Sequence, residues 1–296
     1  MSRRIADAVA GSFGMDTITL AGPLRAKLGA MAGAGFGQVM LKADDLVGHP
    51  DGWRAAVAEV RASGLRPTGF QVLRDFEGLS DELHAYKVDV AKQMLQMCAA
   101  VGGKVLLACS STSAHASADQ QQIVRDLRKL AMLALPLGIR IAYEALSWGR
   151  HVNEYTVAWE IVEQADCPNL GLCIDSYHIL AAGTSLAHLE RIDASRIFLV
   201  QLSDFMWQQT ANFEDRKATA RSFRVFPGEG AHTAQLAQLV RALGATGYQG
   251  DMSFEVFNDD YLQMPLETVA ARARRSAAWL TEEVLQSPAA LAAVMR

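Results

Sequence analysis

Residues 140–175 read RIAYEALSWGRHVNEYTVAWEIVEQADCPNLGLCID and contain one complete strand–helix–strand unit. The runs 140–143 and 170–174 are short and mostly apolar, which is typical of strands that are buried on both faces. Between them, residues 153–166 place apolar side chains at helical spacing. A strand, a helix and a second strand in this order predict a parallel βαβ unit.

The same alternation continues in both directions along the chain. The predicted strands are 17–20, 38–41, 67–72, 104–108, 140–143, 170–174, 197–201 and 252–256. The predicted helices are 23–34, 51–62, 81–101, 118–137, 153–166, 231–243 and 265–285. Eight such units favour a single (β/α)8 TIM barrel. The rival is a doubly wound open sheet, but the chain lacks the glycine-rich phosphate turn expected after its first strand.

The domain organisation follows from length and composition. The chain has 296 residues, of which 50% are hydrophobic and 20% charged. We expect one barrel domain over residues 1–296, with a core over about 16–285, a short N-terminal extension and a C-terminal tail. This composition excludes long-range disorder.

The charge and hydropathy of the chain limit the kinds of partner that it is expected to bind. The net charge of −4 gives no electrostatic footprint for nucleic acid or for an anionic membrane surface. No window approaches the roughly 18 apolar residues of a membrane span. The N-terminal stretch is broken by Asp7, Gly11 and Gly14, so it is a poor secretory signal. Four cysteines without CxxC spacing fit a reducing compartment, and we expect a cytoplasmic protein.

Oxygen-bearing side chains end four consecutive predicted strands. They are Glu144, Asp175, Gln201 and Glu255. In a barrel the C-terminal ends of the strands meet at one mouth, where the chemistry takes place. Three carboxylates and one amide oxygen form a hard-oxygen ligand set that suits Mg²⁺ or Mn²⁺. The alternative is that these residues are strand caps or the starts of solvated loops.

Further candidates lie near the same strand ends. His178 follows Asp175 by three residues and is a candidate general base or substrate donor, or else a loop cap. His151 follows Glu144 by seven residues and stands in an equivalent position. Arg74 and Arg224 lie beside aromatic and glycine residues, and either could bind a carboxylate in bidentate fashion. Cys173 shares a strand face with Asp175 and is interpreted as barrel filling.

At this point the chain resembles a known family. The segments YEALSWGRHVN, DSYH, QLSD, FRVFPGEG and SFEVFND, together with RDFEG, are similar to those of the xylose-isomerase-like barrels. Within that superfamily they resemble bacterial 3-dehydroshikimate dehydratases. The resemblance implies metal ligation by Glu144, Asp175, Gln201 and Glu255. It also implies a catalytic or substrate-contacting role for His178, and substrate contacts by Arg74 and Arg224.

Two departures from the family pattern stand out. Such dehydratases tend to show Val-Glu-Ile-Phe-Glu-Asn-Asp after the second strand, whereas residues 39–45 here read VMLKADD. Two acidic positions have thus become Met40 and Ala43, and Lys42 is new. The loop 204–230 is also longer than the pattern predicts.

The chemistry that follows has two main forms. A base removes the proton α to a metal-polarised carbonyl, and loss of the β-hydroxyl then makes the protein a lyase that converts 3-dehydroshikimate to protocatechuate. Return of the proton elsewhere makes it a keto-sugar or inosose isomerase or epimerase. The cofactor is a divalent ion, Mg²⁺, Mn²⁺ or Co²⁺, and the substrate a small polyhydroxylated keto compound. If His178 is not the base, Glu144, His151 or Lys42 remains as a candidate.

Two other classes of protein, a nuclease and a non-catalytic binding protein, fit the sequence less well. A nuclease of the same fold needs a histidine-rich zinc cluster, which the strand ends do not offer. A binding barrel without chemistry disagrees with the four-ligand set. A homo-oligomer is compatible with the sequence.

Overall fold

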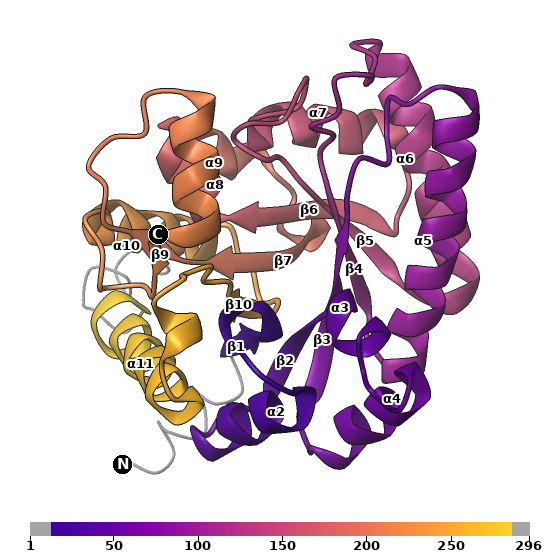
Figure 1. The fold of residues 1–296 in the computed structure, drawn as a ribbon. Helices are drawn as coiled ribbons and strands as arrows, with labels where there is room; N and C mark the ends of the chain where they lie inside the picture. The colour runs from indigo at the N-terminus through magenta and orange to yellow at the C-terminus, as the bar shows by residue number, and fades with distance from the viewer. Residues whose placement is uncertain (1–12, 286–296) are drawn as a thin grey trace.

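A computed structural model of the chain describes residues 13–285, and its eight parallel strands close into a barrel (Figure 1). Around the barrel the strand order is β1-β10-β7-β6-β5-β4-β3-β2. The strands are β1 (Phe13–Asp16), β2 (Gln38–Lys42), β3 (Arg66–Leu73), β4 (Val105–Cys109), β5 (Arg140–Glu144), β6 (Leu170–Asp175), β7 (Ile197–Leu202) and β10 (Met252–Phe254). The predicted TIM barrel is confirmed.

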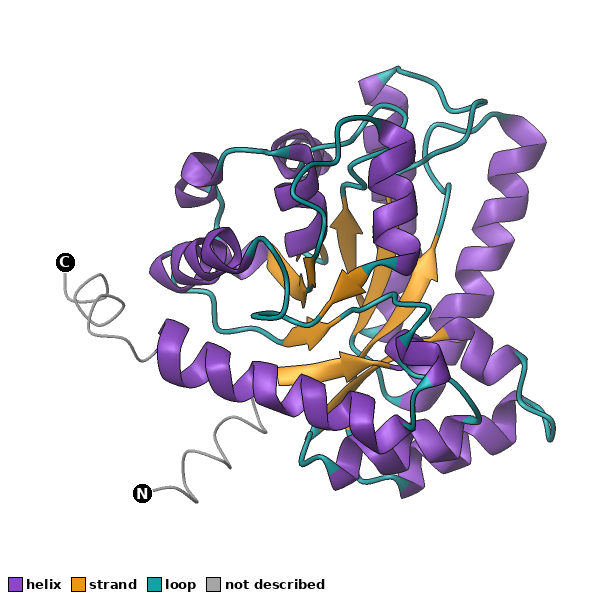
Figure 2. Ribbon diagram, turned by 60° about the vertical axis from the view of Figure 1, so that its left-hand side comes forward, coloured by secondary structure: helices purple, strands orange, loops and turns teal. Residues whose placement is uncertain are grey.

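Helices form a ring around the strands (Figure 2). They are α2 (Leu24–Gly33), α3 (Ala43–Val47), α4 (Trp53–Ala62), α5 (Asp81–Val101), α6 (Gln120–Ala134), α7 (Tyr155–Ala165), α8 (Ser176–Ala182), α9 (Phe213–Ser222), α10 (Thr233–Ala245) and α11 (Leu266–Trp279). All seven predicted helices are found. In the described part of the chain no helix has the length and hydropathy that a membrane span requires. The predicted N-terminal extension and tail lie largely outside the described residues.

The first strand is the one strand that the sequence misplaces. The prediction put it at 17–20, but β1 is Phe13–Asp16 and Thr17–Thr19 form a short 3-10 helix. Threonine has a high propensity for strands, yet here the two threonine hydroxyls accept hydrogen bonds from backbone N–H groups at the ends of neighbouring strands. Thr17 Oγ1 accepts from the Lys42 N–H at 2.9 Å, and Thr19 Oγ1 accepts from the Val256 N–H at 3.1 Å. The core expected from residue 16 therefore begins at least three residues earlier.

The long segment 204–230 is not an open loop. It contains a two-residue antiparallel pair, β8 (Asp204–Phe205) with β9 (Arg224–Val225), and helix α9 lies between them. In Figure 1 this orange segment lies beside the strand ends of β6 and β7. The pairing returns the chain to the barrel mouth, so Arg224 is brought back to the ends of the strands.

The barrel interior is filled below the strand ends. A cluster of fully buried side chains occupies it: Met40, Val105, Leu107, Ala142, Cys173, Phe198 and Leu199. Because this layer is apolar and packed, the barrel is not a pore, and polar chemistry is confined to its C-terminal mouth.

Candidate metal centre

The barrel mouth opens into a cavity of about 770 Å³. Its floor includes Gln71, Cys109, Glu144, His178, Arg224 and Glu255. Its walls carry further cationic side chains: Lys27, Lys42, Arg74, Lys87 and Arg221. The cavity therefore combines a buried acidic floor with a cationic rim.

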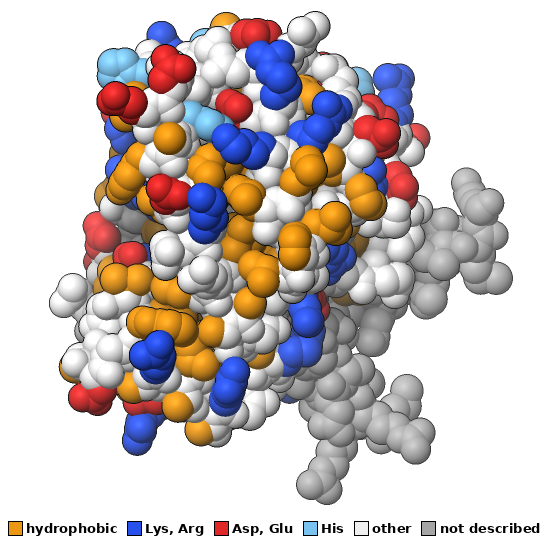
Figure 3. All heavy atoms as spheres, turned by 90° about the vertical axis from the view of Figure 1, so that its right-hand side faces the viewer, with side chains coloured by type: hydrophobic (Ala, Val, Ile, Leu, Met, Phe, Trp, Pro, Cys, Tyr) orange, Lys and Arg blue, Asp and Glu red, His pale blue; other side chains and the backbone are white. Residues whose placement is uncertain are grey.

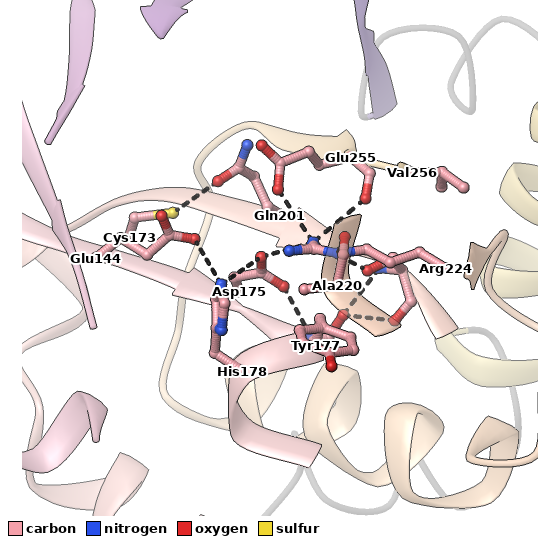
Figure 4. Close-up of polar contacts among 12 residues, drawn as sticks. Glu144, Cys173, Asp175, Tyr177, His178, Gln201, Ala220, Arg224, Glu255 and Val256 are labelled. Atoms are coloured by element: carbon pink, nitrogen blue, oxygen red, sulfur yellow. Dashed lines mark hydrogen bonds and ion pairs between the residues drawn. The ribbon is translucent and has the colours of Figure 1, made fainter. Parts of the chain in front are cut away.

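Glu144 ends β5 and is buried on this floor (Figure 4). Its Oε2 accepts a hydrogen bond from the Cys109 thiol at 2.8 Å, whereas its Oε1 has no hydrogen-bond partner among the described residues. Burial, followed by the charges of Asp175 and Glu255, raises the pKa of Glu144 well above its usual range. A buried carboxylate oxygen without a partner is costly, so this atom is placed for a ligand or a proton.

Asp175 and Glu255 share one guanidinium. Arg224 Nη1 lies 2.9 Å from Asp175 Oδ2 and 3.0 Å from Glu255 Oε2 (Figure 4). Burial acts to raise the pKa of Asp175, but Arg224, His178 and the Tyr177 N–H together outweigh it and the pKa is lowered. For Glu255 burial prevails over Arg224, and its pKa rises to about 7. Arg224 thus binds two strand-end carboxylates that would otherwise repel each other.

His178 lies in the first turn of α8, directly after β6. Its Nε2 is 3.6 Å from both Glu144 Oε1 and Asp175 Oδ2. Its Nδ1 accepts the Ser147 N–H at 3.0 Å. Burial lowers the pKa of His178 to about 3, so the ring is neutral at neutral pH. Since Nδ1 is an acceptor, the hydrogen-bond network assigns the proton to Nε2.

Together these groups fit a divalent cation. Ligand atoms of Glu144, Asp175 and His178 all lie within 4.8 Å of one another. Within residues 13–285 Arg224 is the only lysine or arginine that forms an ion pair with Asp175 or Glu255. One guanidinium does not balance three buried carboxylates, and among the described residues Glu144 Oε1 has no hydrogen-bond partner. A bound cation would offset this repulsion and the lost hydration.

Gln201 lies next to this cluster, in the penultimate position of β7. It is fully buried, and its Oε1 accepts from the Cys173 thiol at 3.3 Å. Cys173 belongs to the packed interior layer, as the sequence indicates. All four strand-end residues named by the sequence therefore meet in one region of the barrel mouth (Figure 4).

The other predicted site residues lie in different parts of the cavity. Arg74 is exposed on the cavity wall, and Lys42 lines the same wall while pairing with Asp44 at 2.6 Å. Arg224 is buried, and its Nε donates to the Ala220 carbonyl at 2.9 Å.

His151 is not brought to the cavity. Its Nε2 contacts the Ala116 carbonyl at 2.9 Å. The Arg150 N–H donates to the Ser111 carbonyl at 2.7 Å, which holds this loop against the loop after β4. Spacing from Glu144 does not show which way the loop turns, so the position expected for His151 was wrong.

Several residues of the site were not predicted from the sequence. Cys109 ends β4, and a strand-end rule that also included thiols would have found it. Asp16 ends β1 but stood before the misplaced first strand. Gln71 lies inside β3, and Arg221 lies on α9, which has no apolar periodicity to reveal it.

A closed parallel barrel with buried carboxylates at its strand ends defines a class of metal-binding TIM barrels. The sequence profile described as "Xylose isomerase-like TIM barrel" matches residues 28–283, and the chain belongs to this family.

Named relatives share much of the sequence. The chain is 37% identical over 270 residues, 90% of its length, to a 3-dehydroshikimate dehydratase of Pseudomonas putida. It is 27% identical over 222 residues, 72% of its length and 75% of the relative's, to an inosose isomerase of Bacillus subtilis.

A solved structure shares the fold as well. It is described as a xylose isomerase-like TIM barrel/4-hydroxyphenylpyruvate dioxygenase fusion protein, with 35% identity and a TM-score of 0.85. The match covers 93% of this chain and 44% of that one. The chain likewise spans 41% of the length of the Pseudomonas dehydratase.

Proposed function

We propose that the chain is a divalent-metal-dependent lyase that dehydrates 3-dehydroshikimate to protocatechuate. The observation that carries this proposal is the buried group of Glu144, Asp175 and His178 on the floor of a cavity with a cationic rim. An anionic, hydroxylated keto acid matches both parts, because its carboxylate suits the rim and its oxygens suit the floor. The 37% identity to a named 3-dehydroshikimate dehydratase supports the same substrate.

The proposed ligands of the cation are Glu144, Asp175, Gln201 and Glu255. Their hard oxygen atoms favour Mg²⁺, Mn²⁺ or Co²⁺ over softer ions. When bound, the ion supplies electrophilic stabilisation of the negative charge that develops on the substrate carbonyl oxygen.

Glu144 and His178 are the proposed catalytic residues. Among the described residues Glu144 Oε1 has no hydrogen-bond partner, so it is free to accept the proton α to the carbonyl. His178 acts as a donor at Nε2, because its Nδ1 is already occupied by the Ser147 N–H. This donor faces the developing oxyanion or the departing hydroxyl. Trp148 packs against the imidazole with ring centroids 4.9 Å apart and keeps water from it.

Binding of the substrate carboxylate is assigned to the cavity wall. Arg74 and Arg221 are exposed on this wall, and in the described part of the chain neither side chain forms an ion pair. Arg224, in contrast, already contacts Asp175 and Glu255. We therefore place the carboxylate at Arg74 and Arg221 and reserve for Arg224 the ordering of the floor.

The direct test is turnover of 3-dehydroshikimate by the Mn²⁺-loaded protein, followed by the absorbance of the aromatic product. The proposal predicts stoichiometric formation of protocatechuate, abolished in Glu144→Ala. Absence of the aromatic product at high enzyme concentration, with metal bound, would overturn it.

The second candidate is a keto-sugar or inosose isomerase that uses the same floor. The observation that favours it is Lys42, a cation on the cavity wall that replaces the expected pattern after β2. The relative named inosose isomerase matches 72% of the chain. Incubation with an inosose, followed by NMR of the ring protons, separates this candidate from the lyase.

Assembly and compartment remain predictions. The α5 side of the barrel carries hydrophobic side chains between lysines and arginines (Figure 3), including Leu83 and Tyr86 on α5. If a homo-oligomer forms, we expect this face to be its interface, and light scattering would measure its mass. The proposed cytoplasmic location rests on four free cysteines.

A further inference from the structure

Asp16 is a buried carboxylate beneath the proposed metal centre, and it ends β1. It accepts hydrogen bonds from Gln201 Nε2 at 2.7 Å, from Gln71 Nε2 at 3.1 Å and from the Ser253 hydroxyl. These donors come from β7, β3 and β10, so one side chain ties three strands together inside the barrel mouth. Asp16 is not among the residues that line the cavity, so it acts through its partners.

The main consequence concerns the amide of Gln201. Its nitrogen has two acceptors, Asp16 Oδ2 at 2.7 Å and Gln71 Oε1 at 3.1 Å. With the nitrogen held on the Asp16 side, the oxygen must face the other way, toward the Cys173 thiol (Figure 4). An amide turned by 180° would bring its oxygen against the carboxylate of Asp16. The network therefore selects the one amide orientation in which Gln201 can be a metal ligand.

The strand register gives Asp16 a particular relation to Met40. In the pairing of β1 with β2, Asp16 lies directly opposite Met40. Both side chains are fully buried inside the barrel. A carboxylate introduced at position 40 would therefore lie at the same level of the barrel as Asp16.

We propose that Asp16 is a positioning residue that fixes the Gln201 amide with its oxygen toward the bound cation. This proposal rests on the ligand role proposed for Gln201, and on hydrogen-bond geometry alone. Outer groups that orient metal ligands typically contribute 10- to 100-fold to metal affinity. Gln71 supports the same orientation from the cavity side.

The test is the affinity for Mn²⁺, measured on the full chain by electron paramagnetic resonance without substrate. Asp16→Leu removes every acceptor at similar volume and should weaken Mn²⁺ binding by about 10- to 100-fold. Asp16→Asn keeps one acceptor oxygen for the Gln201 amide and should stay within a few-fold of the wild type. Met40→Leu conserves volume at the paired position and is the matched control.

A relocated carboxylate provides the second arm. Adding Met40→Glu to Asp16→Leu places a longer acid at the paired position, and it should recover most of the lost affinity. Melting of each variant in chelator shows whether it folds. If Asp16→Leu does not fold, Asp16→Ala takes its place, because it also removes the acceptor of the Gln201 amide and should weaken Mn²⁺ binding to a similar extent.

The outcomes decide between the two proposals. Wild-type Mn²⁺ affinity in folded Asp16→Leu, or in Asp16→Ala if it takes its place, overturns the positioning role. Wild-type affinity in Gln201→Ala overturns the ligand role on which it depends. A protein that binds Mn²⁺ but does not dehydrate 3-dehydroshikimate contradicts only the proposed function, because this affinity is measured without substrate.

Discussion

The backbone N–H of Ser147 donates to Nδ1 of His178 at 3.0 Å, and the Ser147 hydroxyl lies 3.2 Å from the same nitrogen. Ser147 follows β5 by three residues and His178 lies in α8, so this contact joins the loops of two neighbouring strands. It leaves only Nε2 to face Glu144 and Asp175. From the sequence, His178 is a candidate for either a base or a donor; this contact orients it as a donor.

Two substitutions of His178 should therefore differ. Glutamine can place a donor near the former Nε2, whereas asparagine is too short to do so. We expect His178→Asn to lower kcat by about 10²–10³, the usual effect of losing an oxyanion donor, and His178→Gln to lose distinctly less. Because the pKa of His178 is lowered to about 3, neither variant should remove a limb of the pH–rate profile near neutrality. Equal losses in both variants, with such a limb gone, would restore the base assignment.

Arg74 should affect substrate binding more than the chemical step. Its guanidinium is exposed on the cavity wall, where it can bind the carboxylate of the proposed substrate. Arg74→Ala should raise KM by about 10- to 100-fold, the loss of roughly 1.5–3 kcal/mol for a hydrogen bond to a charged group. Arg25→Ala is the control, since that side chain is 82% exposed and pairs with Glu59. An unchanged KM in Arg74→Ala would favour a neutral sugar substrate.

Glu77 should make stability depend on pH. It is a buried residue of the loop after β3 and accepts from the Ser111 N–H at 2.5 Å and the Tyr143 hydroxyl at 3.0 Å. Burial raises its pKa from 4.5 to about 7. Between these values the folded chain binds more protons than the unfolded chain, so this residue makes the free energy of unfolding fall as pH rises from about 4.5 to 7.

The glutamine variant isolates this effect. Glu77→Gln keeps an acceptor for Ser111 and Tyr143 but does not ionise. Its free energy of unfolding relative to the wild type should therefore increase by on the order of 3 kcal/mol between pH 4.5 and pH 8. Urea denaturation at several pH values measures this difference. Parallel curves for the two proteins would show that Glu77 does not titrate in this range.

The strand pattern predicted the barrel because seven apolar runs coincide with strands that are buried on both faces. The prediction for the first strand was wrong because the hydroxyls of Thr17 and Thr19 accept hydrogen bonds from backbone N–H groups at the ends of neighbouring strands. Strand propensity does not show such contacts. That error also hid Asp16. Helix α9 was missed because it is polar and carries no apolar face.

The sequence predicted the positions of those site residues that lie at the ends of strands. Glu144, Asp175, Gln201 and Glu255 end or nearly end successive strands, and closure of the barrel brings them together. The side-chain pairing of Arg224 with Asp175 and Glu255 could not be predicted, because it depends on how residues 204–230 fold back through the β8–β9 pair.

Chelation should separate the ligands from other acidic residues. Removal of metal should abolish turnover, and Mg²⁺, Mn²⁺ or Co²⁺ should restore it. Glu255→Ala should lose bound metal, because it removes one of the proposed oxygen ligands. Asp44→Ala is the control, since this exposed acid lines the cavity and, within residues 13–285, its carboxylate pairs only with Lys42. Full metal content in Glu255→Ala, measured by atomic emission, would remove Glu255 from the ligand set.

The most direct measurement is anomalous X-ray diffraction from crystals grown with Mn²⁺. The account predicts one strong peak at the barrel mouth, within about 2.0–2.3 Å of oxygen atoms of Glu144, Asp175, Gln201 and Glu255. His178 should lie beyond coordination distance, with Nδ1 still bonded to Ser147. A peak coordinated by His178 in place of Gln201, or no peak at the strand ends, would contradict the account.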